Sequence, residues 1–130
     1  MTPGSQPTSP PASSIPSSGY EPKAGDDQLT RDPVLMDLEN SQLVVMESYP
    51  IQVSVNLKGN LPDPCHELRV QVTPVNAQNQ VKLDVYSVVD STKACITVLQ
   101  PFEVTVPIGS YTSGHYSVYV NDQLLGEFDG

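Results

Sequence analysis

The 130-residue chain contains no tryptophan, and aromatic residues make up only 6% of it. Any core must therefore be built mainly from aliphatic side chains. No run of about 18 apolar residues occurs, so the sequence offers no candidate transmembrane helix. Six Lys and Arg residues are scattered among fifteen Asp and Glu residues, and the net charge is -9. Neutralising phosphates requires clustered basic residues, so we expect neither a nucleic-acid partner nor an anionic membrane surface.

The N-terminal part has the composition of a disordered segment. Seven of the thirteen prolines fall within residues 1–33, in a stretch rich in Ser and Thr with almost nothing to bury. Such a segment cannot offset the entropy of ordering. The sequence therefore predicts a disordered Pro/Ser/Thr-rich leader or tether over residues 1–31 and a folded domain over residues 32–130.

The start at Met1 shows neither the basic nor the apolar region of a signal peptide. A leader of this kind before a β-domain nevertheless resembles the tether of an exported or surface-anchored protein whose signal has been removed. We therefore expect an extracytoplasmic location, secreted or anchored to the cell surface. The alternative is a cytoplasmic protein with a disordered tail. No third cysteine is present to carry a lipid, so membrane attachment would need an N-terminal anchor that this sequence does not contain.

From Asp32 onward, apolar and polar residues alternate with a period of two, which is typical of half-buried strands. The segments "IQVSVNL", "HELRVQV", "VKLDVYSVV", "ACITVL", "FEVTVPI" and "HYSVYV" recur every 8 to 12 residues with turn-forming residues between them. This spacing predicts an all-β fold, an antiparallel immunoglobulin-like β-sandwich of about seven to eight strands.

The stretch "LPDPCHELRV" places Cys65, His66 and Glu67 side by side. Neighbouring side chains of a strand point to opposite faces, which disfavours a Cys65–His66 catalytic dyad. A zinc site from Cys65, His66, Cys95 and His115 would lack the usual short ligand spacings. Two cysteines in a small chain with an export-like leader favour a Cys65–Cys95 disulfide. Both lie in phase with polar positions, so we expect the bridge on an outer face or at a strand end.

The closing segment Gly114-x-Tyr116-x-Val118-x-Val120-Asn121 resembles the last strands of immunoglobulin-like bacterial domains. Together with "LPDPCHELRV", Cys95 and "FEVTVPIG", it resembles a group of small bacterial exported or lipid-anchored proteins of uncharacterised function. The resemblance covers residues 32–130. It implies a tyrosine-corner role for Tyr116, whose hydroxyl would bond back to nearby backbone. It brings no catalytic residues.

We expect a non-enzymatic cell-envelope domain, a monomer without cofactor or metal, that binds another protein or a surface polymer. Sandwiches of this kind bind through end loops or open sheet edges. The sequence predicts two binding loops, Lys58–Pro64 and Gly109–Gly114. Their candidate contact residues are Lys58, Asn60, Asp63, Tyr111 and Thr112. The alternative for Tyr111 is a ring that folds back onto the sandwich.

Two alternatives are a proteinase inhibitor that presents the stiff "LPDPC" loop and a metal-dependent hydrolase. The hydrolase would use His66, Glu67 and His115.

Overall fold

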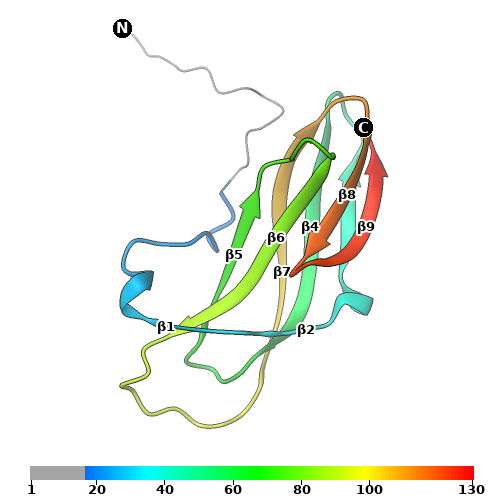
Figure 1. Ribbon diagram of the computed structural model, residues 1–130. Coiled ribbons are helices and arrows are strands. Elements are labelled where there is room, and N and C mark those ends of the chain that lie inside the picture. The colour runs from blue at the N-terminus through cyan, green and yellow to red at the C-terminus, as the bar shows by residue number, and fades with distance from the viewer. Residues whose placement is uncertain (1–16) are drawn as a thin grey trace, which may run out of the picture.

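Alternating apolar and polar residues build two facing β-sheets in the computed structural model, which describes residues 17–130 (Figure 1). The described residues form nine strands and two short 3-10 helices. The all-β sandwich predicted from the sequence is confirmed. Residues 1–16 of the predicted leader lie outside the described residues. Within the described part, no helix is long and apolar enough to cross a membrane.

The first sheet is organised around its longest strand, β6. It contains β1 (Thr30–Asp32), β5 (Glu67–Thr73), β6 (Gln80–Val89), β8 (His115–Val120) and β9 (Gln123–Asp129). β5 pairs with β6 along one side. β1 and β8 pair with opposite ends of β6, and β9 follows β8 as the outer strand. β8 runs parallel to β6, so the sheet is mixed and the prediction of a wholly antiparallel sandwich is wrong at this pair.

The second sheet is organised in the same way around β4. It contains β2 (Leu35–Met36), β3 (Gln42–Met46), β4 (Ile51–Leu61) and β7 (Gln100–Tyr111). β7 pairs along the whole of β4, while β2 and β3 pair with its two ends. Pro33 lies between β1 and β2, where the chain passes from one sheet to the other. The 3-10 helices are η3 (Asp26–Gln28) and η4 (Leu38–Asn40).

The core between the sheets is aliphatic, as the lack of tryptophan implies. The alternation in β4 buries Val53, Val55 and Leu57, and it continues through Gly59 to Leu61. Gly59 is buried where an added Cβ would lie 2.5 Å from the Leu35 carbonyl oxygen. Only glycine fits there, so this glycine marks close packing within a strand and does not mark a turn.

An aromatic cluster closes the core near the C-terminus. The rings of Tyr111, Tyr116 and Phe128 lie with centroids 5.0 to 5.1 Å apart. The Tyr116 hydroxyl donates to the Thr112 carbonyl oxygen at 3.2 Å, which is the backbone contact expected of a tyrosine corner. Gly114 adopts a φ of +142°, and a Cβ there would lie 3.2 Å from the Tyr116 hydroxyl.

Residues Ser17–Leu29, here called the N-terminal strap, pack against the sandwich and extend the folded part upstream of the predicted boundary at Asp32. The Tyr20 carbonyl oxygen accepts a hydrogen bond from the Val70 N–H at 2.8 Å, at the free side of β5. Asp26 accepts hydrogen bonds from the Arg69 guanidinium at 3.0 and 3.3 Å. Arg69 is only 4% exposed, so the strap both covers and neutralises a cation that the core cannot solvate.

Candidate functional site

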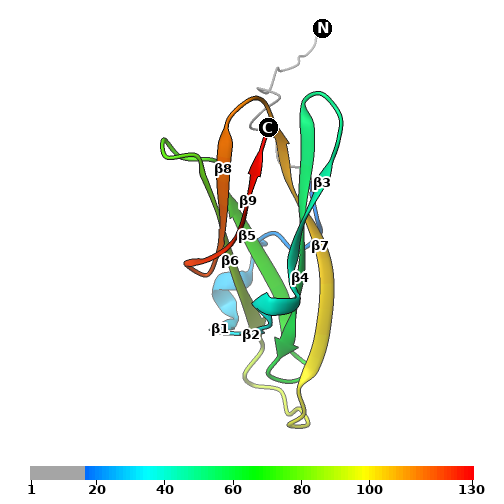
Figure 2. The ribbon, with the colours of Figure 1, turned by 90° about the vertical axis from the view of Figure 1, so that its right-hand side faces the viewer.

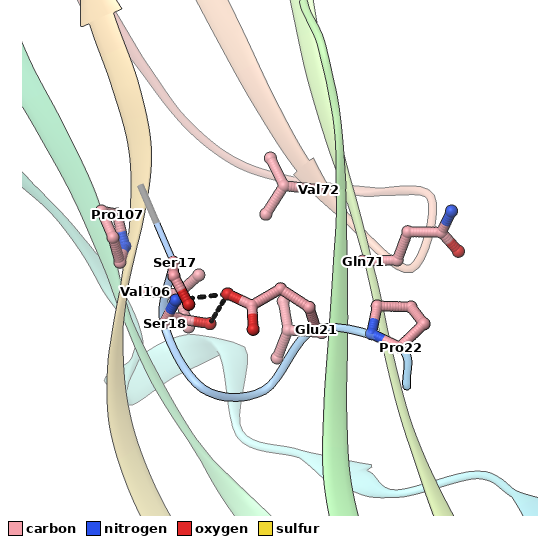
Figure 3. A pocket seen from close by; sticks show the side chains of 9 residues that line it. Ser17, Ser18, Glu21, Pro22, Gln71, Val72, Val106 and Pro107 are labelled. Atoms are coloured by element: carbon pink, nitrogen blue, oxygen red, sulfur yellow. Dashed lines mark hydrogen bonds between the residues drawn. The ribbon is translucent and has the colours of Figure 1, made fainter. Parts of the chain in front are cut away.

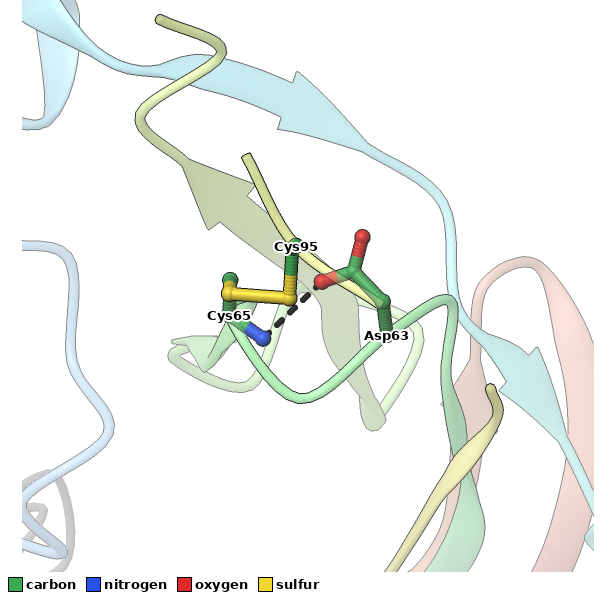
Figure 4. A group of neighbouring side chains, drawn as sticks. All are labelled: Asp63, Cys65 and Cys95. Atoms are coloured by element: carbon green, nitrogen blue, oxygen red, sulfur yellow. Dashed lines mark hydrogen bonds between the residues drawn. A yellow bond between two sulfur atoms is a disulfide. The ribbon is translucent and has the colours of Figure 1, made fainter. Parts of the chain in front are cut away.

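Cys65 and Cys95 form a disulfide that joins two loops at one end of the sandwich (Figure 4). Cys65 belongs to the loop between β4 and β5, and Cys95 to the longer loop between β6 and β7. The predicted bridge is present, and it lies beyond the strand ends and not in the core. We call this region, Pro62–His66 together with Asp90–Leu99, the disulfide end.

Asp63 shapes the first of these loops. Its carboxylate accepts hydrogen bonds from the Cys65 N–H at 2.9 Å and from His66 Nδ1 at 2.7 Å. Within residues 17–130, Asp63, Cys65 and Cys95 form the one group of three side chains whose single ligand atoms all lie within 4.8 Å of one another. Since both sulfurs are consumed by the bridge, this group cannot act as a thiolate metal site.

His66 is buried and links this loop to β1. Its Nδ1 faces Asp63 and its Nε2 faces Asp32, each at 2.7 Å. A neutral imidazole has one N–H and an ionised carboxylate has none, so only the protonated ring donates to both. Burial is the largest single influence on His66 and lowers its pKa, but the hydrogen bonds to Asp32 and Asp63 together with the charges of both carboxylates outweigh it, so the pKa is raised.

The residues of the zinc and hydrolase alternatives do not meet. His66 immediately precedes β5, whose first residue Glu67 pairs with Val88 near the end of β6. His115 begins β8, which pairs with the start of β6. The two histidines therefore lie at opposite ends of β6, a separation of roughly 30 Å at the rise of a strand. The Glu67 carboxylate instead contacts Arg69 at 3.3 Å. The described structure therefore brings together neither of these two alternative sites.

His115 has its own carboxylate partners on the outer strand. Its ring contacts Asp129 at 2.7 Å and also Glu127, both from β9. The hydrogen bonds to Asp129 and Glu127 raise the pKa of His115. Both ring nitrogens of His115 are thus engaged by side chains of the neighbouring strand β9. These contacts give the histidine a structural role in joining β8 to β9.

The second loop of the disulfide end exposes apolar side chains. The sequence predicts a strand at "ACITVL", but Ala94–Leu99 forms none, and within the described structure its backbone makes no hydrogen bond to another segment. Ile96, Val98 and Leu99 are 68%, 49% and 55% exposed. β-branched and leucine side chains gathered in so short a stretch are unusual on a surface of this size. This segment is the apolar surface of the disulfide end.

The loop predicted at Gly109–Gly114 is largely strand and core. β7 extends through Tyr111, whose ring is buried and whose hydroxyl donates to the Ile108 carbonyl oxygen at 2.7 Å. Burial, with a smaller contribution from Tyr116, raises the pKa of Tyr111 to about 12. The prediction that Tyr111 is a binding residue is wrong, because the aromatic cluster holds it inside. Thr112 is exposed in the remaining short turn.

The loop predicted at Lys58–Pro64 is also shorter than expected. Lys58 and Asn60 lie within β4, opposite Glu103 and Pro101 of β7, so their assignment to a binding loop is wrong. Asp63 does lie in a loop, but its carboxylate is turned inward to His66 and Cys65. Leu61 is buried and the Asp63 carboxylate is turned inward, so neither side chain is presented outward as the contact residues of an inhibitor loop would be.

Sequence reasoning missed a groove beside the N-terminal strap. It has a volume of about 410 Å³ and lies between the free sides of β5 and β7 (Figure 3). Val70, Val72 and Val106 form its apolar wall, and Ser18 and Glu21 of the strap form its rim. The strap thus already occupies part of this opening, which leaves the disulfide end as the more accessible apolar surface.

Comparisons with known proteins identify the fold but no activity. The family model described as the ORF11 beta-sandwich domain matches residues 55–129. A curated relative, the "Uncharacterized 10.2 kDa protein in HgiCIIM 5'region" of Herpetosiphon aurantiacus, is 32% identical over 91 residues, which cover 67% of this chain and 93% of the relative. No solved structure matches the chain.

Proposed function

This chain belongs to the ORF11 beta-sandwich domain family, and from that premise we propose that it is a non-enzymatic, extracytoplasmic domain that binds another protein at its disulfide end. The observation that carries the proposal is the set of apolar side chains exposed at Ile96, Val98 and Leu99, beside the Cys65–Cys95 bridge.

The disulfide supports the extracytoplasmic location. Disulfides persist in oxidising compartments and are rare where thiols are kept reduced. The Pro/Ser/Thr-rich composition upstream of the sandwich supports the same location, because it suits a tether that holds a domain away from a cell surface. An exported or lipid-anchored protein of the cell envelope accounts for both features.

The exposed side chains support binding. Leaving apolar area in water costs roughly 25 cal/mol per Å² relative to burying it, so a partner that covers Ile96, Val98 and Leu99 gains free energy. The disulfide fixes Cys95, the residue just before them, and so reduces the entropy lost when the segment is ordered on binding. A protein partner fits this surface better than a polar surface polymer, since the contact is apolar.

The geometry also favours binding over catalysis. Among the described residues, His66 and His115 are each engaged by carboxylates at opposite ends of β6. Within residues 17–130, the ring hydrogen bonds of both histidines go to carboxylates, and none goes to a serine, threonine or cysteine side chain. The disulfide end offers shape and apolar area, which are the requirements of an interface.

The experiment compares the whole chain with a variant in which Ile96, Val98 and Leu99 are each replaced by serine. Both are immobilised and exposed to cell-envelope extract, and the captured proteins are quantified. The control is Leu124→Ser, which removes a side chain of similar exposure, 51%, from β9. We expect the triple variant to lose its specific partner at least tenfold while the control keeps it.

Three results would contradict the proposal. They are equal capture by all three proteins, capture that survives protease treatment of the extract, and catalytic turnover by the purified chain. Survival after protease treatment would identify a surface polymer as the ligand.

A further inference from the structure

The outer edges of the two sheets differ in how they are protected against pairing with another chain. An unpaired strand edge presents free N–H and C=O groups, and proteins usually block it with charges, prolines or a covering segment. Four long strands form outer edges here: β5 and β9 in one sheet, β3 and β7 in the other. β1 and β2 are only three and two residues long.

Two of these edges carry clear obstacles. β5 contains Glu67 and Arg69, and the N-terminal strap covers part of its free side through the bond between Val70 and Tyr20. β7 contains two prolines, Pro101 and Pro107, neither of which can donate a backbone hydrogen bond to a new strand.

The edge strand β9 is also protected, whereas β3 is not. β9 carries Glu127 and Asp129. β3 reads Gln42-Leu-Val-Val-Met46 and contains no charge, no proline and no glycine. Figure 2 looks onto the side of the sandwich where β3 and β9 form the two edges. β3 is therefore the one long edge among residues 17–130 with none of these protective devices.

The side chains of β3 are apolar on both faces. Leu43 points inward and packs against the core, so Val44 and Met46 point outward. Val44 is 37% exposed and Met46 is 60% exposed. Val45 shares the inward phase of Leu43 but remains 41% exposed, because residues 17–130 leave it partly uncovered at this edge.

We propose that β3 pairs antiparallel with β3 of a second copy of this chain, about a two-fold axis at Val44. The two four-stranded sheets would then become one continuous eight-stranded sheet. In this register Val44 faces Val44 of the partner, Leu43 faces the partner's Val45, and Gln42 faces the partner's Met46. Each half-exposed Val45 gains an apolar neighbour, which is the complementarity that a two-fold contact requires.

The charge pattern supports a second copy as the occupant. Two chains of net charge -9 repel at long range, but in this register no carboxylate faces another. β3 itself carries no charged residue, and Glu47, the residue just after it, falls beside the partner's Ser41, the residue just before the partner's β3. Tyr49 is 92% exposed next to the β3–β4 hairpin and offers on the order of 150 Å² to such a contact.

The proposal predicts a weak dimer that salt strengthens. The interface is short, which places it below the size of standard stable complexes. The remaining repulsion is between separated acidic surfaces, and salt screens it as the Debye length falls from about 30 Å at 0.01 M to about 8 Å at 0.15 M. This salt dependence is opposite to that of a contact held by ion pairs.

Sedimentation equilibrium of the whole chain at about 1 to 500 μM covers the dissociation constants expected for a weak dimer with a small interface. We expect a reversible dimer of the 14.1-kDa chain, tighter at 0.15 M than at 0.01 M salt. Val44→Lys places like charges opposite each other on the axis and should weaken dimerisation at least tenfold. The matched control is Leu124→Lys, at an exposed apolar residue of β9 that belongs neither to β3 nor to the disulfide end, and it should leave dimerisation unchanged.

Cross-linking tests the register itself. In Val44→Cys, the two new thiols would sit across an antiparallel pair with Cα atoms about 4.5 to 5.5 Å apart, within the range of a disulfide. We expect a dimer cross-linked through residue 44 on mild oxidation, and none from Leu124→Cys, whose new thiol lies on β9. A chain that stays monomeric at the highest concentration overturns the proposal, as does a dimer insensitive to Val44→Lys or one that fails to cross-link at residue 44.

Discussion

The Cys65–Cys95 bridge should supply a large share of the stability of this domain. The two cysteines are 30 residues apart in the sequence. On the chain-entropy model, closing a loop of that length in the unfolded state contributes about 3.6 kcal/mol at 25 °C. A domain of this size has about 5 to 15 kcal/mol in total, so the bridge provides between a quarter and most of it.

The perturbation is the double variant Cys65→Ala/Cys95→Ala, measured by urea unfolding beside the oxidised wild type. Cys65 is exposed and Cys95 is half-buried, so removing the sulfurs loses few packing contacts. The change in the free energy of unfolding therefore measures the effect of closing the loop. We expect a loss of about 3.6 kcal/mol and a fall in Tm of roughly 15 °C. A loss below about 1 kcal/mol would refute the loop-closure reasoning. Val98→Ala, in the same exposed loop, is the control for local packing.

Three further predictions concern the interior and one end of the sandwich. The pKa of His66 is raised, so its contribution to stability is present below about pH 6.5 and is lost as the pH rises through the folded-state value; the difference in urea midpoint between wild type and His66→Gln should shrink as the pH rises above about 6.5. Tyr111→Phe removes the buried donor to the Ile108 carbonyl oxygen and should cost about 1 to 2 kcal/mol in urea unfolding. Gly114→Ala forces a Cβ against the Tyr116 hydroxyl at a positive φ and should cost about 1 to 3 kcal/mol.

Matched variants separate the causes. His115→Gln removes the exposed histidine, whose pKa is also raised. The dependence of its unfolding midpoint on pH gives the contribution of His115, which is subtracted to obtain that of His66. Gly25 has a φ of +95° but no neighbour within 4 Å of an added Cβ, so Gly25→Ala reports backbone strain alone. Equal losses for Gly25→Ala and Gly114→Ala would show that the contact with Tyr116 contributes nothing. A difference in urea midpoint between wild type and His66→Gln that widens above about pH 7 would contradict the hydrogen bonds of His66 to Asp32 and Asp63.

The fold was predictable because the core is built from local alternation. β4 and β8 show the period of two that places their valines inside, and this pattern needs no knowledge of distant residues. The same reasoning ended β4 too early, at Leu57. Gly59 and Asn60 have the composition of a turn, but the close approach of the Leu35 backbone makes glycine a requirement of the strand.

The remaining errors involve contacts between residues far apart in the sequence. The N-terminal strap has a polar, disorder-like composition, yet Asp26 is held by Arg69, 43 residues away. Tyr111 follows a glycine and a serine, as loop residues do, but its ring completes a cluster with Tyr116 and Phe128. The phase of the strands correctly placed both cysteines outside the core. This prediction depends only on which face of a strand a residue shares with its near neighbours.

The central claim is that an oxidised bridge holds an apolar binding segment outside the reducing cytoplasm. The most direct test traps the thiols of the protein taken from its own cells by acid quenching, alkylates them in denaturant with and without prior reduction, and measures the intact mass. We expect the mass of a single chain that takes up no label until reductant is added, and then takes up two. Two thiols labelled without reductant would contradict both the location and the constraint on Ile96–Leu99.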